Sequence, residues 1–171
     1  GGSEYLKTIH GRVAGGAPAV DLAAERSLQG ALLEGIRAGV VRSAHDCADG
    51  GLAVALAESA FGADWGVDVE LEDDLPLAPL LFGEAQGRAV VSCRRGDEAA
   101  LLEIARSNGV PASRIGEVGA PGAAFRIRTR AGVLDTRTGT LAAVYFGAIP
   151  RRMDGAPETV EAALESIVEN P

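Results

Sequence analysis

Apolar residues recur along this chain with two different spacings, and each spacing predicts one kind of element. Where they lie three or four positions apart and a Gly or Asn closes the stretch, an amphipathic helix is expected. Four stretches have this character: the residues between Asp21 and Gly39, those between Gly51 and Gly62, and the ranges 97–107 and 157–169. We therefore expect helices in these four places.

Shorter apolar runs bounded by Gly, Pro or charged residues predict strands. Five of them cover residues 40–45, 67–72, 88–93, 115–118 and 125–129. The first begins with two valines and is interpreted as a strand buried in a sheet with both faces covered. Residues 76–83 are expected to be irregular or a short helix, and 140–146 fit either a helix or a strand because their apolar residues show no clean period. The alternation of strands with helices predicts one layered α/β sandwich.

Composition narrows the class of protein without identifying it. The chain has 171 residues, of which 47% are hydrophobic, so one compact domain is expected. Its formal net charge of -8 opposes a nucleic-acid-binding surface, and no apolar run approaches the roughly 20 residues of a membrane span. Two cysteines are too few for a disulfide framework, so we expect a cytoplasmic protein. From the charge and the short apolar runs, we expect neither nucleic acid nor membrane as a partner. The chain opens Gly1-Gly2-Ser3 without a methionine, which indicates processing, a tag or a longer parent sequence.

The sequence SAHDCADGGL, residues 43–52, joins the end of a predicted strand to the start of a predicted helix. The free N–H groups and positive dipole end of that helix can hold an anion, and Gly50 and Gly51 would let a phosphate approach the backbone closely. The spacing matches neither the P-loop nor the dinucleotide-binding glycine motif. Asp49 has an alternative role as the helix N-cap, whereas Asp46 would be a Mg²⁺ ligand if phosphate binds here. An anion site and a structural turn both remain open.

His45 and Cys47 also raise the question of zinc or nucleophilic chemistry. A tetrahedral zinc site would need both histidines and both cysteines of the chain, and His10 has no spacing that brings it to the others. A cysteine–histidine nucleophile pair lacks a third group to orient it. We therefore interpret Cys47 and Cys93 as small buried apolar residues.

A second polar stretch, FGEAQGR at residues 82–88, enters another predicted strand. If it is extended, Glu84, Gln86 and Arg88 alternate toward one side and offer a carboxylate, an amide and a guanidinium to a polar ligand. The other interpretation is an ordinary turn with Arg88 on a strand face. The residues alone leave both open.

Four stretches together resemble a known family: SAHDCADGGLAVALAE, GGSEYLKTIHG upstream of it, LFGEAQGR in the middle and AIPRRM near the end. They are similar to the C-terminal portion of phosphoribosylformylglycinamidine synthase, the synthetase subunit of purine biosynthesis. The resemblance implies that residues 1–171 are the single C-terminal domain of a longer multidomain synthase. It also implies an α/β (α+β) fold like the C-terminal domain of aminoimidazole ribonucleotide synthetase, with a mixed β-sheet covered by helices and a partly ferredoxin-like arrangement.

The same resemblance implies roles for single residues. Asp46 matches the family's metal-binding aspartate, and Glu84 and Gln86 match a loop that meets the substrate. The implied cofactors are Mg²⁺ and ATP or ADP, and the residues expected to bind the nucleotide are Asp49, Gly50, Gly51, Glu84, Gln86 and Arg88. Ala85 stands where the family loop has a serine, so one hydroxyl contact is lost, as expected for a non-catalytic half. We therefore expect no catalytic residue in this chain and no activity from the isolated domain.

The implied parent is an ATP-dependent C–N ligase. It would convert formylglycinamide ribonucleotide and glutamine-derived ammonia to formylglycinamidine ribonucleotide, with ADP and phosphate as the other products. Its implied partners are the remaining domains of the same chain, a glutaminase subunit and a small accessory subunit. The alternative is an autonomous anion-binding or protein-interaction module without an enzymatic role. An exposed contiguous apolar patch would favour the domain of a larger protein.

Overall fold

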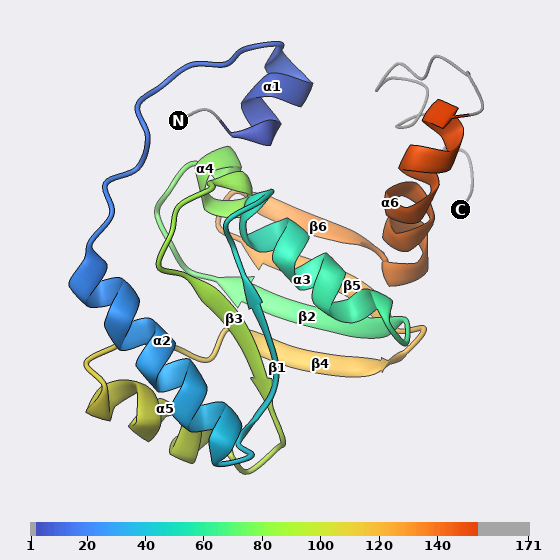
Figure 1. Cartoon of the computed structure of the whole chain (residues 1–171). Coiled ribbons are helices and arrows are strands. Elements are labelled where there is room, and N and C mark those ends of the chain that lie inside the picture. Colours follow the sequence, from blue (N-terminus) through green and yellow to red (C-terminus); the bar gives the residue numbers. More distant parts are fainter. Residues whose placement is uncertain (1–2, 154–171) are drawn as a thin grey trace.

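A computed structural model describes residues 3–153 and shows a mixed α/β domain (Figure 1). The helices are α1 (Glu4–His10), α2 (Leu22–Arg37), α3 (Gly51–Phe61), α4 (Leu77–Phe82), α5 (Glu98–Ser107) and α6 (Thr138–Met153). The strands are β1 (Val41–Asp46), β2 (Trp65–Leu71), β3 (Ala89–Cys93), β4 (Gly116–Pro121), β5 (Ala124–Thr129) and β6 (Gly132–Arg137). The expected α/β class, with a mixed sheet and covering helices, is confirmed.

The larger sheet has the strand order β4-β2-β5-β6 and contains the core of the domain. Strands β2 and β5 are parallel neighbours, while β4 and β6 pair antiparallel on either side of them. The alternation of Val67, Val69 and Leu71 with acidic residues places all three apolar side chains on one face of β2. Helix α3 lies across this face (Figure 1), and its buried residues pack there with Phe125 and Ile127 of β5.

Charged side chains occupy the alternate positions of the same strands. Arg128 of β5 pairs with Asp68 of β2, and Arg126 pairs with Asp135 of β6 at 2.6 Å. Because side chains alternate between the two faces of a strand, these ion pairs lie on the face away from α3. The two-residue period read from the sequence therefore separates the core face from the charged face of this sheet.

Strands β1 and β3 form a separate two-stranded antiparallel ribbon, so the strands make two sheets rather than one. The prediction that residues 40–45 form a strand buried on both faces is wrong, because Ser43 and Ala44 are exposed. After its two valines this strand has small or polar side chains, and the Ser43 hydroxyl lies 2.6 Å from the Ser92 hydroxyl across the ribbon. Helices α2 and α5 pack together beside it (Figure 1).

The predicted helix boundaries agree well with the structure where a capping residue was present. Asp21 is the N-cap of α2 and accepts hydrogen bonds from Ala23 N at 2.9 Å and Ala24 N at 3.1 Å. The ambiguous residues 140–146 belong to α6, and residues 77–82 form the short helix α4. The predicted helix at 157–169 lies outside the described residues.

Two elements were not predicted. Helix α1 has only seven residues and fully buries none of them, so its apolar pattern is too short to identify it; it begins at the N-cap Ser3. Strand β6 has a mixed sequence, and it forms because every one of its residues pairs with β5 across a tight turn. Neither element has a local pattern strong enough to identify it without its tertiary partner.

The helices are all short compared with the thickness of a bilayer. The longest in the described part of the chain, α2 and α6, have 16 residues each, and α6 contains Pro150. A membrane-spanning helix needs about 20 predominantly apolar residues. Within residues 3–153, no helix is long and apolar enough to cross a membrane.

Replacing Leu56 tests the packing of α3 on the sheet. Leu56 is 6% exposed in the core cluster, so Leu56→Ala should leave a cavity and destabilise the domain by about 2–5 kcal/mol. Leu33→Ala, at a helical leucine that is 46% exposed, should cost much less. Chemical denaturation of both variants measures the difference, and equal losses would show that α3 does not cover the core.

Candidate anion and metal site

The loop between β1 and α3 contains the residues singled out in the sequence. Asp46 ends β1 with an exposed side chain, and its Oδ2 accepts a hydrogen bond from Ala48 N at 3.2 Å. The N-cap of α3 is Gly50, and no side chain caps this helix. The alternative role of Asp49 as the N-cap is therefore wrong; its side chain is exposed.

Both glycines of this loop adopt backbone angles that favour glycine. Gly50 has φ +73° and Gly51 has φ +75°. A Cβ on Gly51 would lie 2.7 Å from the backbone carbon of Phe82, so α3 begins directly against the end of α4. A Cβ on Gly50 would lie 2.6 Å from a methyl carbon of Val54. The fold itself requires these glycines, whether or not a phosphate approaches them.

Glu84 provides the negative charge at the start of α3. Its Oε1 accepts a hydrogen bond from Gly50 N at 3.0 Å and another, also at 3.0 Å, from Glu4 N at the start of α1. A carboxylate is stabilised at this end of a helix by the helix dipole and the free N–H groups. Glu84 and the glycines of the other loop, separate in the sequence, therefore meet in the structure.

Gln86 and Arg88 do not join Glu84 on a common side. Gly87 between them has φ +74°, so the loop is not extended and the expected alternation is wrong. Gln86 is exposed, whereas Arg88 Nη2 donates back to the carbonyl of Gly83 within its own loop. The Nε atom of Arg88 is buried and, among the described residues, has no hydrogen-bond partner.

Arg88 also connects the second loop to Cys47. The carbonyl of Arg88 accepts a hydrogen bond from Cys47 N at 3.2 Å. Cys47 is 2% exposed, which confirms its interpretation as a buried small residue, whereas Cys93 on β3 is only partly buried. Burial raises the pKa of its thiol above the ordinary value, and the charge of Arg88 offsets only part of this rise. A buried thiol with a raised pKa is a poor nucleophile at neutral pH.

His45 has partners that the sequence did not reveal. Its Nε2 lies 3.0 Å from Glu58 Oε2 on α3, and its Nδ1 lies 2.7 Å from the carbonyl of Asp46. Glu58 also accepts a hydrogen bond from the Tyr145 hydroxyl, which raises the pKa of that phenol. These side chains connect β1, α3 and α6. The sequence left residues 140–146 open between a helix and a strand, so it did not indicate this contact.

The carboxylates near this loop fit a magnesium ion only if a bound nucleotide supplies further ligands. Among residues 3–153, no group of three His, Cys, Asp or Glu side chains gathers around a common point. Mg²⁺ usually binds through one or two carboxylates together with waters and substrate phosphates. Asp46, exposed at the end of β1, therefore suits a magnesium ion that arrives with a nucleotide rather than one held by the protein alone.

A family comparison gives this arrangement its context. The family described as AIR synthase related protein, C-terminal domain, matches residues 1–127, which is most of the chain. The chain belongs to this family. The matched segment contains both loops, α3, β2 and the first part of β5, up to Ile127, while α6 lies beyond it.

Curated relatives are subunits of one enzyme. The chain is 48% identical over 130 residues to phosphoribosylformylglycinamidine synthase subunit PurL of Moorella thermoacetica, covering 76% of this chain and 18% of that protein. It is 42% identical over 150 residues to the same subunit of Thermobifida fusca, covering 88% of this chain and 19% of that protein. The chain thus spans about a fifth of the length of these relatives.

Solved structures show the same fold. The structure of T. maritima PurL complexed with ATP matches with a TM-score of 0.63 at 28% identity, covering 75% of this chain and 24% of that one. The structure of PurLQS from Thermotoga maritima matches with the same TM-score and identity, covering 73% of this chain and 22% of that one. The similarity supports an AIR synthase related fold beyond the sequence match alone.

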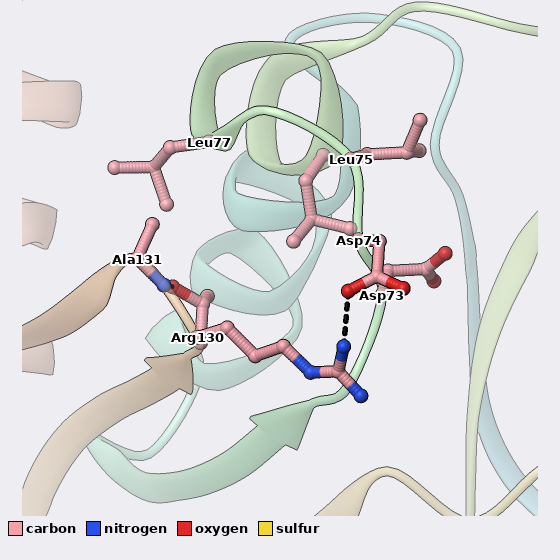
Figure 2. A pocket seen from close by; sticks show the side chains of 8 residues that line it. Asp73, Asp74, Leu75, Leu77, Arg130 and Ala131 are labelled. Atoms are coloured by element: carbon pink, nitrogen blue, oxygen red, sulfur yellow. Dashed lines mark hydrogen bonds and ion pairs between the residues drawn. The ribbon is translucent and has the colours of Figure 1, made fainter.

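A pocket of about 210 Å³ lies elsewhere on the AIR synthase related domain. Figure 2 shows it between the segment that follows β2 and the turn joining β5 to β6, with Asp74 paired to Arg130 at its edge. Leu75 and Leu77 contribute apolar walls. None of the residues predicted to bind a cofactor or metal lines this pocket. The sequence-predicted site is instead a surface formed by two loops.

Gly51→Ala tests whether packing alone requires this glycine. The free energy of unfolding of this variant should fall by about 1–2 kcal/mol because of its left-handed backbone and by about 1–3 kcal/mol more because of the clash with Phe82. The matched control is Gly39→Ala, because Gly39 has φ +71° and nothing within 4 Å of its Cβ position. Unfolding free energies without any ligand should separate the two variants. Equal losses would mean that α3 does not meet α4 as described.

Proposed function

We propose that this chain is the C-terminal domain, residues 1–171, of a PurL-type subunit of phosphoribosylformylglycinamidine synthase. The observation that carries the proposal is the 48% identity over 130 residues to such a subunit. The parent is a cytoplasmic ATP-dependent C–N ligase of purine biosynthesis. It converts formylglycinamide ribonucleotide and ammonia to formylglycinamidine ribonucleotide, and ATP to ADP and phosphate.

The role of this domain in the parent is structural rather than catalytic. The glycines at the start of α3 and the carboxylate of Glu84 are used within the fold, and Ala85 offers no hydroxyl to a substrate. The described cysteine in this region is buried, with a raised thiol pKa. These observations support a domain that positions a nucleotide or the neighbouring domains of the parent without supplying a reacting group.

The nucleotide surface of this proposal is formed by the two loops. Asp46 would hold the magnesium of a bound ATP or ADP, and the N–H groups at Gly50 and Gly51 would face its phosphates. The magnesium ion would neutralise phosphate charge beside the Asp46 carboxylate. The remaining residues predicted from the sequence are Asp49, Glu84, Gln86 and Arg88; of these, Glu84 accepts the Gly50 N–H that a phosphate would use, so it would have to leave that N–H before a phosphate binds there. Support comes from a similar structure described as T. maritima PurL complexed with ATP.

The proposed partners are the rest of the same chain, a glutaminase subunit that supplies ammonia, and a small accessory subunit. Support comes from the relatives, which are named as subunits, and from the similar structure described as PurLQS. The net charge of -8 supports neither a nucleic-acid partner nor one of strongly acidic surface.

An exposed apolar face on α6 favours this proposal over an autonomous anion-binding or interaction module. Phe146 is 62% exposed, and it shares one side of the helix with three other exposed apolar residues: Tyr145, Ile149 and Met153. The rings of Tyr145 and Phe146 also pack against the ring of Phe61 on α3, with centroids 5.2 and 5.5 Å away. A contiguous exposed apolar group of this kind is typical of a surface that another part of a protein covers.

A segment exchange tests the proposed enzyme. Residues 4–153 would replace the matching segment of the M. thermoacetica subunit, and we expect the chimera to form the amidine with its glutaminase and accessory subunits. The same subunit without the segment should fail, and the isolated 171-residue chain should neither hydrolyse ATP nor form the amidine. A well-folded chimera without activity, or turnover by the isolated chain, would contradict the proposal.

Replacing Asp46 in the chimera separates a structural role from a catalytic one. If Asp46 holds the magnesium of a structural nucleotide, Asp46→Asn should reduce the rise in thermal stability that MgADP produces, while turnover of the folded enzyme stays nearly unchanged. Asp73→Asn, a loop aspartate on the pocket instead, serves as the matched control. Normal stabilisation with lost turnover would place Asp46 in the chemistry instead.

A further inference from the structure

One oxygen of Glu84 connects three separate segments of the chain. Oε1 accepts hydrogen bonds from the backbone N–H groups of Glu4 and Gly50, which lie 80 and 34 residues away in the sequence. Both donors stand at helix starts, where backbone N–H groups have no partner within the helix. A single carboxylate therefore ties α1 to the loop that begins α3.

Besides this hydrogen bond, helix α1 packs on the domain through the half-buried side chains of Tyr5 and Leu6. It fully buries none of its residues, and the segment that follows it, residues 11–21, contains no helix or strand and is almost entirely exposed. Its ring contact with the body of the domain is Tyr5, stacked on Phe82 at 5.0 Å with the planes 9° apart. In Figure 1, α1 lies beside α4 at the end of a long extended connection to α2.

Charge makes the Glu84 contact exclusive. A carboxylate bound to backbone N–H groups at a helix start forms charge-assisted hydrogen bonds, which are stronger than neutral ones. A phosphate offered to the same N–H group meets that negative charge at close range. Glu84 and a phosphate therefore cannot both accept the hydrogen bond of Gly50 N.

We propose that Glu84 is a latch that holds α1 against the α3 loop and competes with a phosphate for Gly50. This inference rests on the proposed nucleotide surface for the identity of the competitor, a nucleoside diphosphate with magnesium. With the latch closed, α1 stays docked and Gly50 N–H is occupied. When phosphate replaces Glu84, the same exchange removes the hydrogen bond of Glu4 and releases α1.

Amide hydrogen exchange on the 171-residue chain tests the latch without any ligand. In Glu84→Ala, the amides of Glu4 and Gly50 should exchange about ten-fold faster than in the wild type, since each loses its acceptor. Glu84→Gln keeps a carbonyl acceptor without the charge and should lie between, which also covers the case that the alanine variant folds poorly. Glu117→Gln is the control, because Glu117 is an exposed carboxylate paired with Arg95 and Arg114 instead. Unchanged exchange at Glu4 in both Glu84 variants would overturn the latch.

A titration with MgADP tests the competition. Glu84→Ala should bind MgADP about five- to ten-fold more tightly than the wild type, and wild-type exchange at Glu4 should rise as MgADP is added. Binding by Glu84→Ala no tighter than by the wild type, including no binding by either, would overturn the competition. Asp46→Asn distinguishes this failure from that of the proposed function: if it leaves MgADP binding unchanged in the Glu84→Ala background, the nucleotide surface is wrong even where the latch stands.

Discussion

The close contact between the start of α3 and the end of α4 sets the arrangement of everything near the candidate site. Because Gly51 has no side chain, α3 begins against the backbone of Phe82. This approach brings the loop that follows α4 beside the loop that precedes α3, so Glu84 reaches Gly50. It also places the Phe82 ring where Tyr5 can stack on it. The position of α1 therefore depends on the close approach that Gly51 allows, because Glu84 and Phe82 are the residues that α1 contacts.

The same contact explains why residues typical of a ligand site are engaged within the fold. A helix start without a capping side chain attracts an anion, and the anion available inside the domain is Glu84. Glycines that would admit a phosphate are also the glycines that admit a helix end. Sequence features that indicate phosphate binding and features that indicate close packing are therefore the same residue types, and only their surroundings tell them apart.

The charged surface of the domain has its ion pairs within the domain, whereas its apolar surface is exposed and would be stabilised by contact with a partner. The open face of the larger sheet satisfies its charges internally, through pairs such as Arg126 with Asp135. The apolar face of α6 has no such compensation, and Phe146 and Ile149 are 62% and 70% exposed. Burying that face would stabilise a larger assembly by the hydrophobic effect, which is consistent with a chain that spans about a fifth of its relatives.

Elements with local signals could be predicted from the residue order. Helix α2 follows from Asp21 and its apolar stripe, and the inward face of β2 follows from alternating valines, because a capping side chain and a two-residue period act within a few residues. The resemblance in its motifs also determined the family, since those motifs are read directly from residue order. The α/β class follows in the same way from the alternation of element types.

The contacts of the candidate site residues depend instead on how distant segments pack together. Strand β6 exists through its pairing with β5, and Asp49 loses the N-cap position to Gly50 because the loop turns left-handed there. Glu84 gains its two hydrogen bonds from residues 80 and 34 positions away. Such contacts depend on how α3 and α4 meet in space, and no local period or spacing records the distance between segments so far apart in the chain.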